Sequence, residues 1–196
     1  MKRILIVLLL ILSMMICLPA CKNNKIEENP EFAKFNTMFE AAFENYTITV
    51  DTTSPDGHEL NDKYTVSTVN GNKTVTYSIE TLNLFDISGD AISVPNGYKN
   101  VQAGTCDATE FNNVTNKSLN LDVPKFQFSY KYINSDMIIP GRVVAKINSL
   151  NGFMGLNVEV KEAKLALQYT ADVPVSMQIT YVTQNGNTVV ITYTFN

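Results

Sequence analysis

Few residues of this 196-residue chain combine the side chains and the spacing that chemistry requires. The single histidine, His58, follows the turn sequence 54–57 (Ser-Pro-Asp-Gly), where we expect a solvated loop side chain. Four acids gather around the same turn and offer the oxygen ligands that a hard cation such as calcium prefers: Asp51, Asp56, Glu59 and Asp62. Their spacing departs from an EF-hand loop, because Lys63 stands where such a loop needs its final glutamate. The sequence therefore predicts no metal site.

Nucleophilic and acid–base chemistry has equally little support. Cys106 lies between Thr105 and Asp107, and no basic neighbour in sequence is placed to lower the pKa of its thiol. No Ser-His-Asp arrangement stands out, and no pair of carboxylates is marked out for acid–base work. We therefore expect no enzyme activity, no catalytic residue and no cofactor.

A chemical signal of a different kind lies at the N-terminus. Lys2 and Arg3 precede an apolar run over residues 4–18, and the small residue Ala20 comes directly before Cys21. The apolar run is too short to span a bilayer, which needs about 20 residues. A charged pair, a short apolar run and a small residue before the cleavage site are the parts of a secretory signal peptide. Residues 1–20 are therefore predicted to be removed.

The sequence Leu18-Pro19-Ala20-Cys21 resembles the lipobox of bacterial lipoproteins, although Pro19 stands where that family usually has Ser, Ala, Thr or Gly. The resemblance implies that the Cys21 thiol is joined to a diacylglycerol and acyl chains such as palmitate, and two chains make a stable anchor. It implies a lipid-anchored protein of the bacterial cell envelope that faces outside the cytoplasm. Residues 21–29 then provide the lipidated cysteine and a polar tether.

The rest of the chain has the length and composition of one domain. Loss of residues 1–20 leaves thirteen of the fifteen Lys and Arg against all nineteen Asp and Glu, so the formal charge falls from −4 to −6. No basic stripe is present, which argues against nucleic acid as a partner. With Cys21 lipidated, Cys106 has no intramolecular partner for a disulfide. We expect a single domain over residues 30–196.

A phenylalanine stripe predicts an amphipathic helix from Pro30 to about Asn45. Asn29 suits the N-cap and Pro30 suits the first helical position. Four phenylalanines recur at spacings of three and four residues: Phe32, Phe35, Phe39 and Phe43. Such a stripe either packs into the core or lines a cavity for an apolar ligand, so these four residues are the candidate ligand-binding residues.

From Tyr46 onwards the apolar period changes to two, which predicts strands with one wet face. A two-residue turn at Asn70-Gly71 pairs Tyr64 with Tyr77 and Val66 with Val75, and leaves a polar opposite face. The wet face then holds Lys63, Thr65, Ser67, Thr74, Thr76, Ser78 and Glu80. In the C-terminal hairpin the alternating apolar residues stand at odd positions on both strands, so we expect a three-residue loop, Asn185-Gly186-Asn187. These residues are Met177, Ile179, Tyr181, Val189, Ile191, Tyr193 and Phe195. That loop pairs Tyr181 with Ile191 and Ile179 with Tyr193.

Three further segments complete the expected elements. Residues 126–132 alternate aromatic and polar side chains as a strand does, and residues 140–150 carry a helical stripe that ends at Asn151-Gly152. Residues 156–169 change phase, which predicts either a bulged strand or two strands. Residues 85–120 are rich in Gly, Asn, Asp and Ser, and we expect them to be irregular.

These elements predict an α+β fold. It is a curved, mainly antiparallel β-sheet whose apolar face is covered by the N-terminal amphipathic helix and a second short helix. This order of elements resembles the lipoprotein-carrier fold of LolA and LppX, which implies a half-barrel around helices and a lipid-binding cavity. Two functions follow as expectations. The first is a non-catalytic interaction or structural module that meets an envelope or cell-wall partner. The alternative is a binding or carrier protein for an apolar or amphiphilic ligand. A packed core favours the first function and a cavity favours the second.

Overall fold

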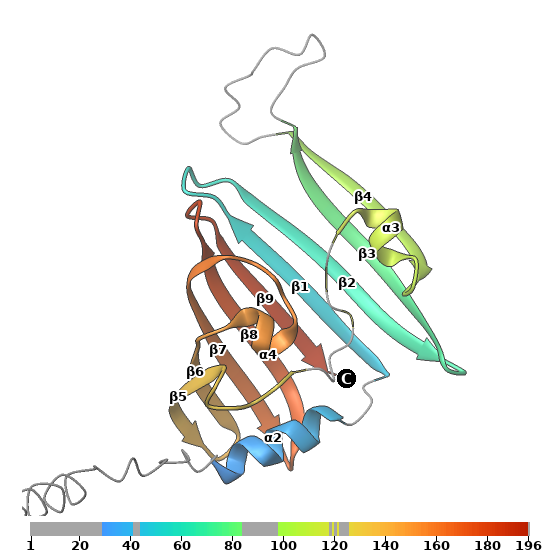
Figure 1. Ribbon diagram of the computed structural model, residues 1–196. Coiled ribbons are helices and arrows are strands. Elements are labelled where there is room, and N and C mark those ends of the chain that lie inside the picture. Colours follow the sequence, from blue (N-terminus) through green and yellow to red (C-terminus); the bar gives the residue numbers. More distant parts are fainter. Residues whose placement is uncertain are drawn as a thin grey trace, which may run out of the picture.

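The computed structural model describes residues 29–40, 44–83, 98–117, 119, 121 and 126–195. These residues form a nine-stranded antiparallel sheet in the order β4-β3-β2-β1-β9-β8-β7-β6-β5, with three helices (Figure 1). The elements are α2 (Pro30–Glu40), β1 (Asn45–Thr53), β2 (Glu59–Val69), β3 (Asn72–Asn83), β4 (Tyr98–Asp107), α3 (Phe111–Thr115), β5 (Ile133–Ile139), β6 (Arg142–Ile147), α4 (Leu150–Met154), β7 (Val160–Thr170), β8 (Val173–Thr183) and β9 (Thr188–Phe195). Cys21 and Phe43, with the predicted signal peptide and tether residues 1–28, lie outside the described residues.

The sheet consists of two meanders that meet at β1 and β9. Strands β1 to β4 run outwards to one edge, and β5 to β9 run back from the other edge until β9 pairs with β1. The helices lie on one side of the sheet, with α2 and α4 over the β5–β9 half and α3 over β3 and β4 (Figure 1). The prediction of a mainly antiparallel sheet with small helices is therefore confirmed.

Helix α2 begins as its sequence predicts. The Asn29 side chain accepts a hydrogen bond from the Glu31 N–H (3.0 Å), which satisfies one of the free donors at the helix start. The helix is described to Glu40, and β1 begins at Asn45, so the helix ends before Asn45, close to the predicted end at about Asn45. Within the described residues no helix is long and apolar enough to cross a membrane.

The first hairpin has the predicted register. Tyr64 pairs with Tyr77 and Val66 pairs with Val75. Asn70 (φ 52°) and Gly71 (φ 80°) both adopt the left-handed conformation that a two-residue hairpin turn requires. The seven residues of the predicted wet face are all exposed or half-buried, so this part of the sheet buries one face only.

The register of the C-terminal hairpin was predicted wrongly by two residues. Tyr181 pairs with Val189, and Ile179 pairs with Ile191. The loop does have three residues, but they are Gln184, Asn185 and Gly186, because the Thr183 N–H donates to the Asn187 carbonyl (2.9 Å). The position of Gly186 explains this register. The last residue of a three-residue hairpin loop needs a positive φ, and Gly186 (φ 86°) occupies that position.

The predicted helix over residues 140–150 was wrong, because residues 142–147 form β6. Val143, Ala145 and Ile147 are buried on one face with the period of a strand. The short helix is α4, which starts where the predicted one ends. The Ser149 side chain caps it by accepting from the Gly152 N–H, and Gly155 ends it in a left-handed conformation.

Two other predictions about segments also need correction. Residues 126–132 do not form a strand, although Phe126 and Phe128 are buried as the alternation requires. This segment is held by a helix side chain instead: the Asn36 amide accepts from the Phe128 N–H (2.8 Å) and donates to the Phe128 carbonyl (2.9 Å).

Residues 98–107, expected to be irregular, form β4. Residues 160–170 form a single strand, β7, and the predicted phase change corresponds to a register shift between Val160 and Glu162, near the start of this strand.

Candidate functional site

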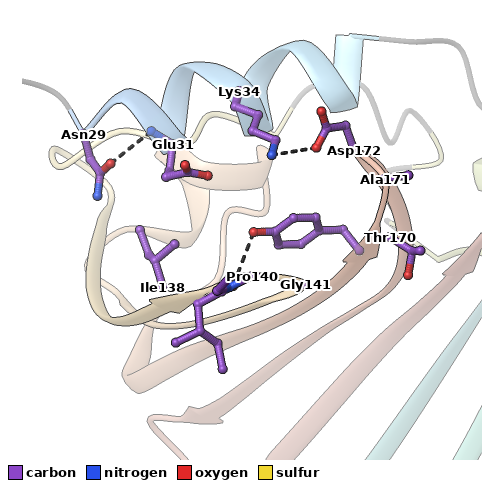
Figure 2. Close-up of a pocket in the computed structure, with 11 residues that line it drawn as sticks. Asn29, Glu31, Lys34, Ile138, Pro140, Gly141, Thr170, Ala171 and Asp172 are labelled. Atoms are coloured by element: carbon purple, nitrogen blue, oxygen red, sulfur yellow. Dashed lines mark hydrogen bonds and ion pairs between the residues drawn. The ribbon is translucent and has the colours of Figure 1, made fainter.

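A cleft opens at one end of the sheet, between α2 and two turns (Figure 2). Its volume is ≈ 760 Å³. We call it the α2 cleft, and its lining comprises Asn29, Glu31, Lys34, Ile138, Ile139, Pro140, Gly141, Tyr169, Thr170, Ala171 and Asp172. The first three residues come from the start of α2, the next four from the β5–β6 turn, and the last four from the β7–β8 turn.

Each turn is held in place by the other. The Tyr169 N–H donates to the Gly141 carbonyl (3.0 Å), and the Tyr169 hydroxyl donates to the Ile139 carbonyl (3.3 Å). Gly141 has φ 80°, and a Cβ atom there would lie 3.2 Å from the Tyr169 carbonyl oxygen. The position therefore requires glycine both for its backbone conformation and for this close approach.

The β7–β8 turn stores backbone strain at the cleft. Ala171 (φ 49°) and Asp172 (φ 64°) are both left-handed, although neither is glycine. Asp tolerates this conformation better than most residues, whereas for Ala it costs about 1–2 kcal/mol. The strand pairing on both sides, with Thr170 opposite Val173, holds the turn in this shape.

The charges in the cleft are largely paired. The Lys34 ammonium lies 2.6 Å from an Asp172 carboxylate oxygen and 5.5 Å from the centre of the Tyr169 ring (Figure 2). The hydrogen bond to Asp172 raises the pKa of Lys34 above its ordinary value, with smaller contributions from nearby charges including Glu31. Both partners are substantially exposed to solvent, so this ion pair positions the turn against α2 more than it stabilises the fold.

The lining of the cleft combines apolar surface with a few charged groups. Its lining supplies apolar surface from Ile138, Ile139 and Pro140, one paired ammonium and two carboxylates. No histidine, cysteine or serine is among the residues that line it.

Three of the four predicted ligand-binding phenylalanines lie in the core and not in the cleft. Phe32, Phe35 and Phe39 have no exposed surface. They belong to a cluster of rings with centroids 5.0–5.9 Å apart, which also contains Phe126, Phe128, Tyr130, Tyr169 and Phe195. Phe43 lies outside the described residues, and a ligand role for the other three stays a prediction.

The acids and the histidine of the 54–58 turn do not converge on a site. Across the described part of the chain, no three His, Cys, Asp or Glu side chains are grouped to hold a metal ion. Asp62 is buried and accepts hydrogen bonds from the Tyr64 hydroxyl (3.0 Å) and the Lys117 ammonium (2.9 Å). It therefore joins the chain after α3 to the sheet. His58 is half-buried and lies 3.3 Å from Asp56 in the loop.

Cys106 has the surroundings of an inert thiol. It is half-buried on β4, and burial raises the pKa of the thiol above its ordinary value. The neighbouring carboxylates of Glu110 and Asp107 raise this pKa further. Because the thiolate is the nucleophilic form, these surroundings disfavour reaction at Cys106.

Sequence reasoning did not find the α2 cleft. Its three contributing segments are far apart in the chain, and no local pattern links Lys34 to Asp172. One local feature sets a cleft segment apart: the turn after Thr170 consists of Ala171 and Asp172, where tight turns usually have Gly or Asn.

Comparison with known proteins adds no functional information. No protein-family model matches the chain, and no curated protein matches it. Among solved structures, a redesigned β-barrel is similar over 76% of this chain and 89% of its own, with 12% sequence identity and a TM-score of 0.21.

Proposed function

We propose that the protein is a lipid-anchored, extracytoplasmic module of the bacterial envelope that acts by contact and not by catalysis. The anchor is Cys21, and the contact site is the α2 cleft with the turns that form it. Asn29 lines the cleft and directly precedes α2, so a tether that ends at Asn29 joins the domain at the proposed contact site.

One observation carries the choice of a contact function. The apolar face of the sheet is filled by the protein's own rings, since Phe32, Phe35 and Phe39 are completely buried and each contacts other aromatic side chains. A ligand in that layer would have to displace packed side chains, which costs burial energy and leaves cavities. A partner can enter the α2 cleft without displacing packed side chains.

The anchor is tested by substituting Cys21, the predicted lipidation site, and Cys106, which has no predicted role in lipidation. Cys21→Ser should abolish incorporation of labelled palmitate and move the protein from the membrane fraction to a soluble or uncleaved form. Cys106→Ser is the matched control and should keep both the label and the membrane location. Equal labelling of the two variants would overturn the lipoprotein assignment.

A second candidate function is the carrier, with the LolA-like and LppX-like half-barrel as its model. It is favoured by Tyr193, which is fully buried and whose hydroxyl has no hydrogen-bond partner among the described residues. A buried hydroxyl without a partner costs about 1–3 kcal/mol, and the polar group of an amphiphilic ligand would recover this cost. Organic extraction and native mass spectrometry of the purified domain distinguish the two functions. Copurified lipid supports the carrier, whereas an empty domain that takes up no fluorescent fatty acid excludes it.

A further inference from the structure

We infer that the end of the domain that carries the α2 cleft docks on the lipid bilayer through exposed apolar side chains. This inference rests on the proposed lipid anchor at Cys21. It goes further by naming the partner of the contact site, which is the bilayer surface.

The first argument is the distribution of exposed apolar side chains. Among the described residues, seven large apolar side chains are exposed, and four of them belong to the strands that form the two cleft turns. These four are Met137, Ile139, Val173 and Val175. Ile139 lines the cleft, and Val173 directly follows the cleft residue Asp172. Exposed apolar side chains gathered at one end mark a contact surface.

The second argument is the length of chain between the anchor and the fold. From Cys21 to Asn29 the chain spans at most about 29 Å, even when fully extended. The opposite end of the sheet carries the tips of the β1–β2 and β8–β9 hairpins, which lie together because a Cβ on Gly186 would be 3.1 Å from the Pro55 ring (Figure 1). β8 alone, with 11 residues, is about 36 Å long. An upright domain resting on those tips would hold Asn29 beyond the reach of the tether, whereas the cleft end lies within it.

The charges indicate an apolar contact and not an electrostatic one. Lys34 is paired with Asp172, the charge of Glu31 is offset by that of the exposed Arg142 next to Gly141, and the chain without residues 1–20 carries a formal charge of −6. These charges give no attraction to an anionic membrane surface. Docking should therefore be insensitive to salt, because salt screens charges but does not weaken apolar burial.

The absence of tryptophan from the chain makes a direct test possible. Val173→Trp places a single reporter at the cleft end, and Ile139→Trp is a second reporter in case the first variant does not fold. Val101→Trp is the matched control: Val101 is 60% exposed, close to the 57% of Val173, but lies on β4 at the opposite edge of the sheet. Each full-length, lipidated variant is reconstituted into phosphatidylethanolamine–phosphatidylglycerol vesicles with or without brominated acyl chains. Mass spectrometry of the same samples reports the lipid on Cys21.

The inference expects blue-shifted emission from Val173→Trp and Ile139→Trp that brominated lipid quenches, at low and at high salt alike. Emission from Val101→Trp should be neither shifted nor quenched. Equal quenching at all three positions, no quenching at the cleft end, or quenching that high salt abolishes would each overturn apolar docking of this end. If Cys21 carries lipid and the reporters stay unquenched, only the docking fails. If Cys21 carries no lipid, the proposed function fails and the docking fails with it.

Discussion

Truncation of Phe39 to Ala tests whether the buried cluster of aromatic rings around α2 is tightly packed. The side chain is completely buried, and its ring lies 5.3 Å from Phe128, 5.4 Å from Phe126 and 5.9 Å from Phe195 between centroids. Phe39→Ala removes this burial and leaves a cavity, which costs about 3–5 kcal/mol in a well-packed core. The cost is a large fraction of the total stability of a domain, which is about 5–15 kcal/mol.

The assay is urea unfolding of the chain from Lys22 onwards, followed by far-ultraviolet circular dichroism. With an m-value of about 2 kcal/mol/M, a loss of 4 kcal/mol lowers the urea midpoint by about 2 M. Thr37→Ala is the control on the same helix, since Thr37 is exposed and its hydroxyl donates to the Ala33 carbonyl (3.1 Å) one turn earlier. We expect this control to change the free energy of unfolding by less than about 0.5 kcal/mol.

The packed-core reasoning is refuted by one combination of results. If Phe39→Ala costs less than about 1 kcal/mol, the side chain does not fill a tightly packed site. If the same variant also loses a bound apolar molecule that the unaltered protein retains, the phenylalanine stripe lines a ligand cavity. The carrier function would then replace the contact function.

Three further predictions use the same purified chain. Asn36→Ala should cost about 2–3 kcal/mol in urea unfolding, because the Phe128 N–H and carbonyl both lose their partner; a cost below about 0.5 kcal/mol would contradict the role of Asn36 as a replacement for strand pairing. Gly186→Ala should cost about 1–2 kcal/mol because φ is 86° at this position, and an unchanged midpoint would show that the loop has another conformation. Asp172→Asn should lower the pKa of Lys34 towards its ordinary value of 10.5 in an NMR titration of the ε-methylene protons. Because the folded-state pKa of Lys34 is raised, the ion pair stabilises the fold below pH 10.5, and this stability is lost as the pH rises through the raised pKa. The variant should not show this loss of stability at alkaline pH. If the pKa of Lys34 is the same in the variant and in the unaltered protein, the two residues are not paired in solution.

The two hairpins show how much of the strand register can be predicted from the sequence. At Asn70-Gly71 the two turn residues both accept positive φ, so the pairing of Tyr64 with Tyr77 follows directly. At the C-terminal hairpin the odd positions do pair with odd positions, since that parity is set by burial on one face. The exact partner depends on where the loop begins, so Tyr181 could pair with Val189 or with Ile191. The positive φ at the last loop position, which Gly186 supplies, selects Val189.

Helix and strand could not be separated over residues 140–150 because both periods fit. Val143, Ile147 and Leu150 have the spacing of a helical stripe, yet Val143, Ala145 and Ile147 have the alternation of a strand. The small side chain of Ala145 gave no apolar signal, although it is completely buried in β6. Pairing with β5 and β7 decides the outcome, and such long-range pairing is invisible in a local window.

The α2 cleft lay beyond sequence reasoning for a related reason. Each of its parts has an ordinary local explanation: Lys34 is a charged residue on an amphipathic helix, Gly141 is a turn glycine, and Asp172 is a turn acid. Only the strand order brings the β5–β6 and β7–β8 turns to the same end of the sheet as the start of α2.

The strained turn links this geometry to the proposed contact function. Ala171 is left-handed where Gly or Asn would fold at lower cost, and the adjacent Asp172 holds α2 through Lys34. Exposed Val173 follows directly, so a conformational cost, an ion pair to the helix and an apolar side chain in solvent occur at three successive positions. None of the three features improves the folding of an isolated hairpin. Because backbone strain and exposed apolar side chains both mark candidate contact surfaces, their coincidence at the cleft end supports the proposed membrane contact there.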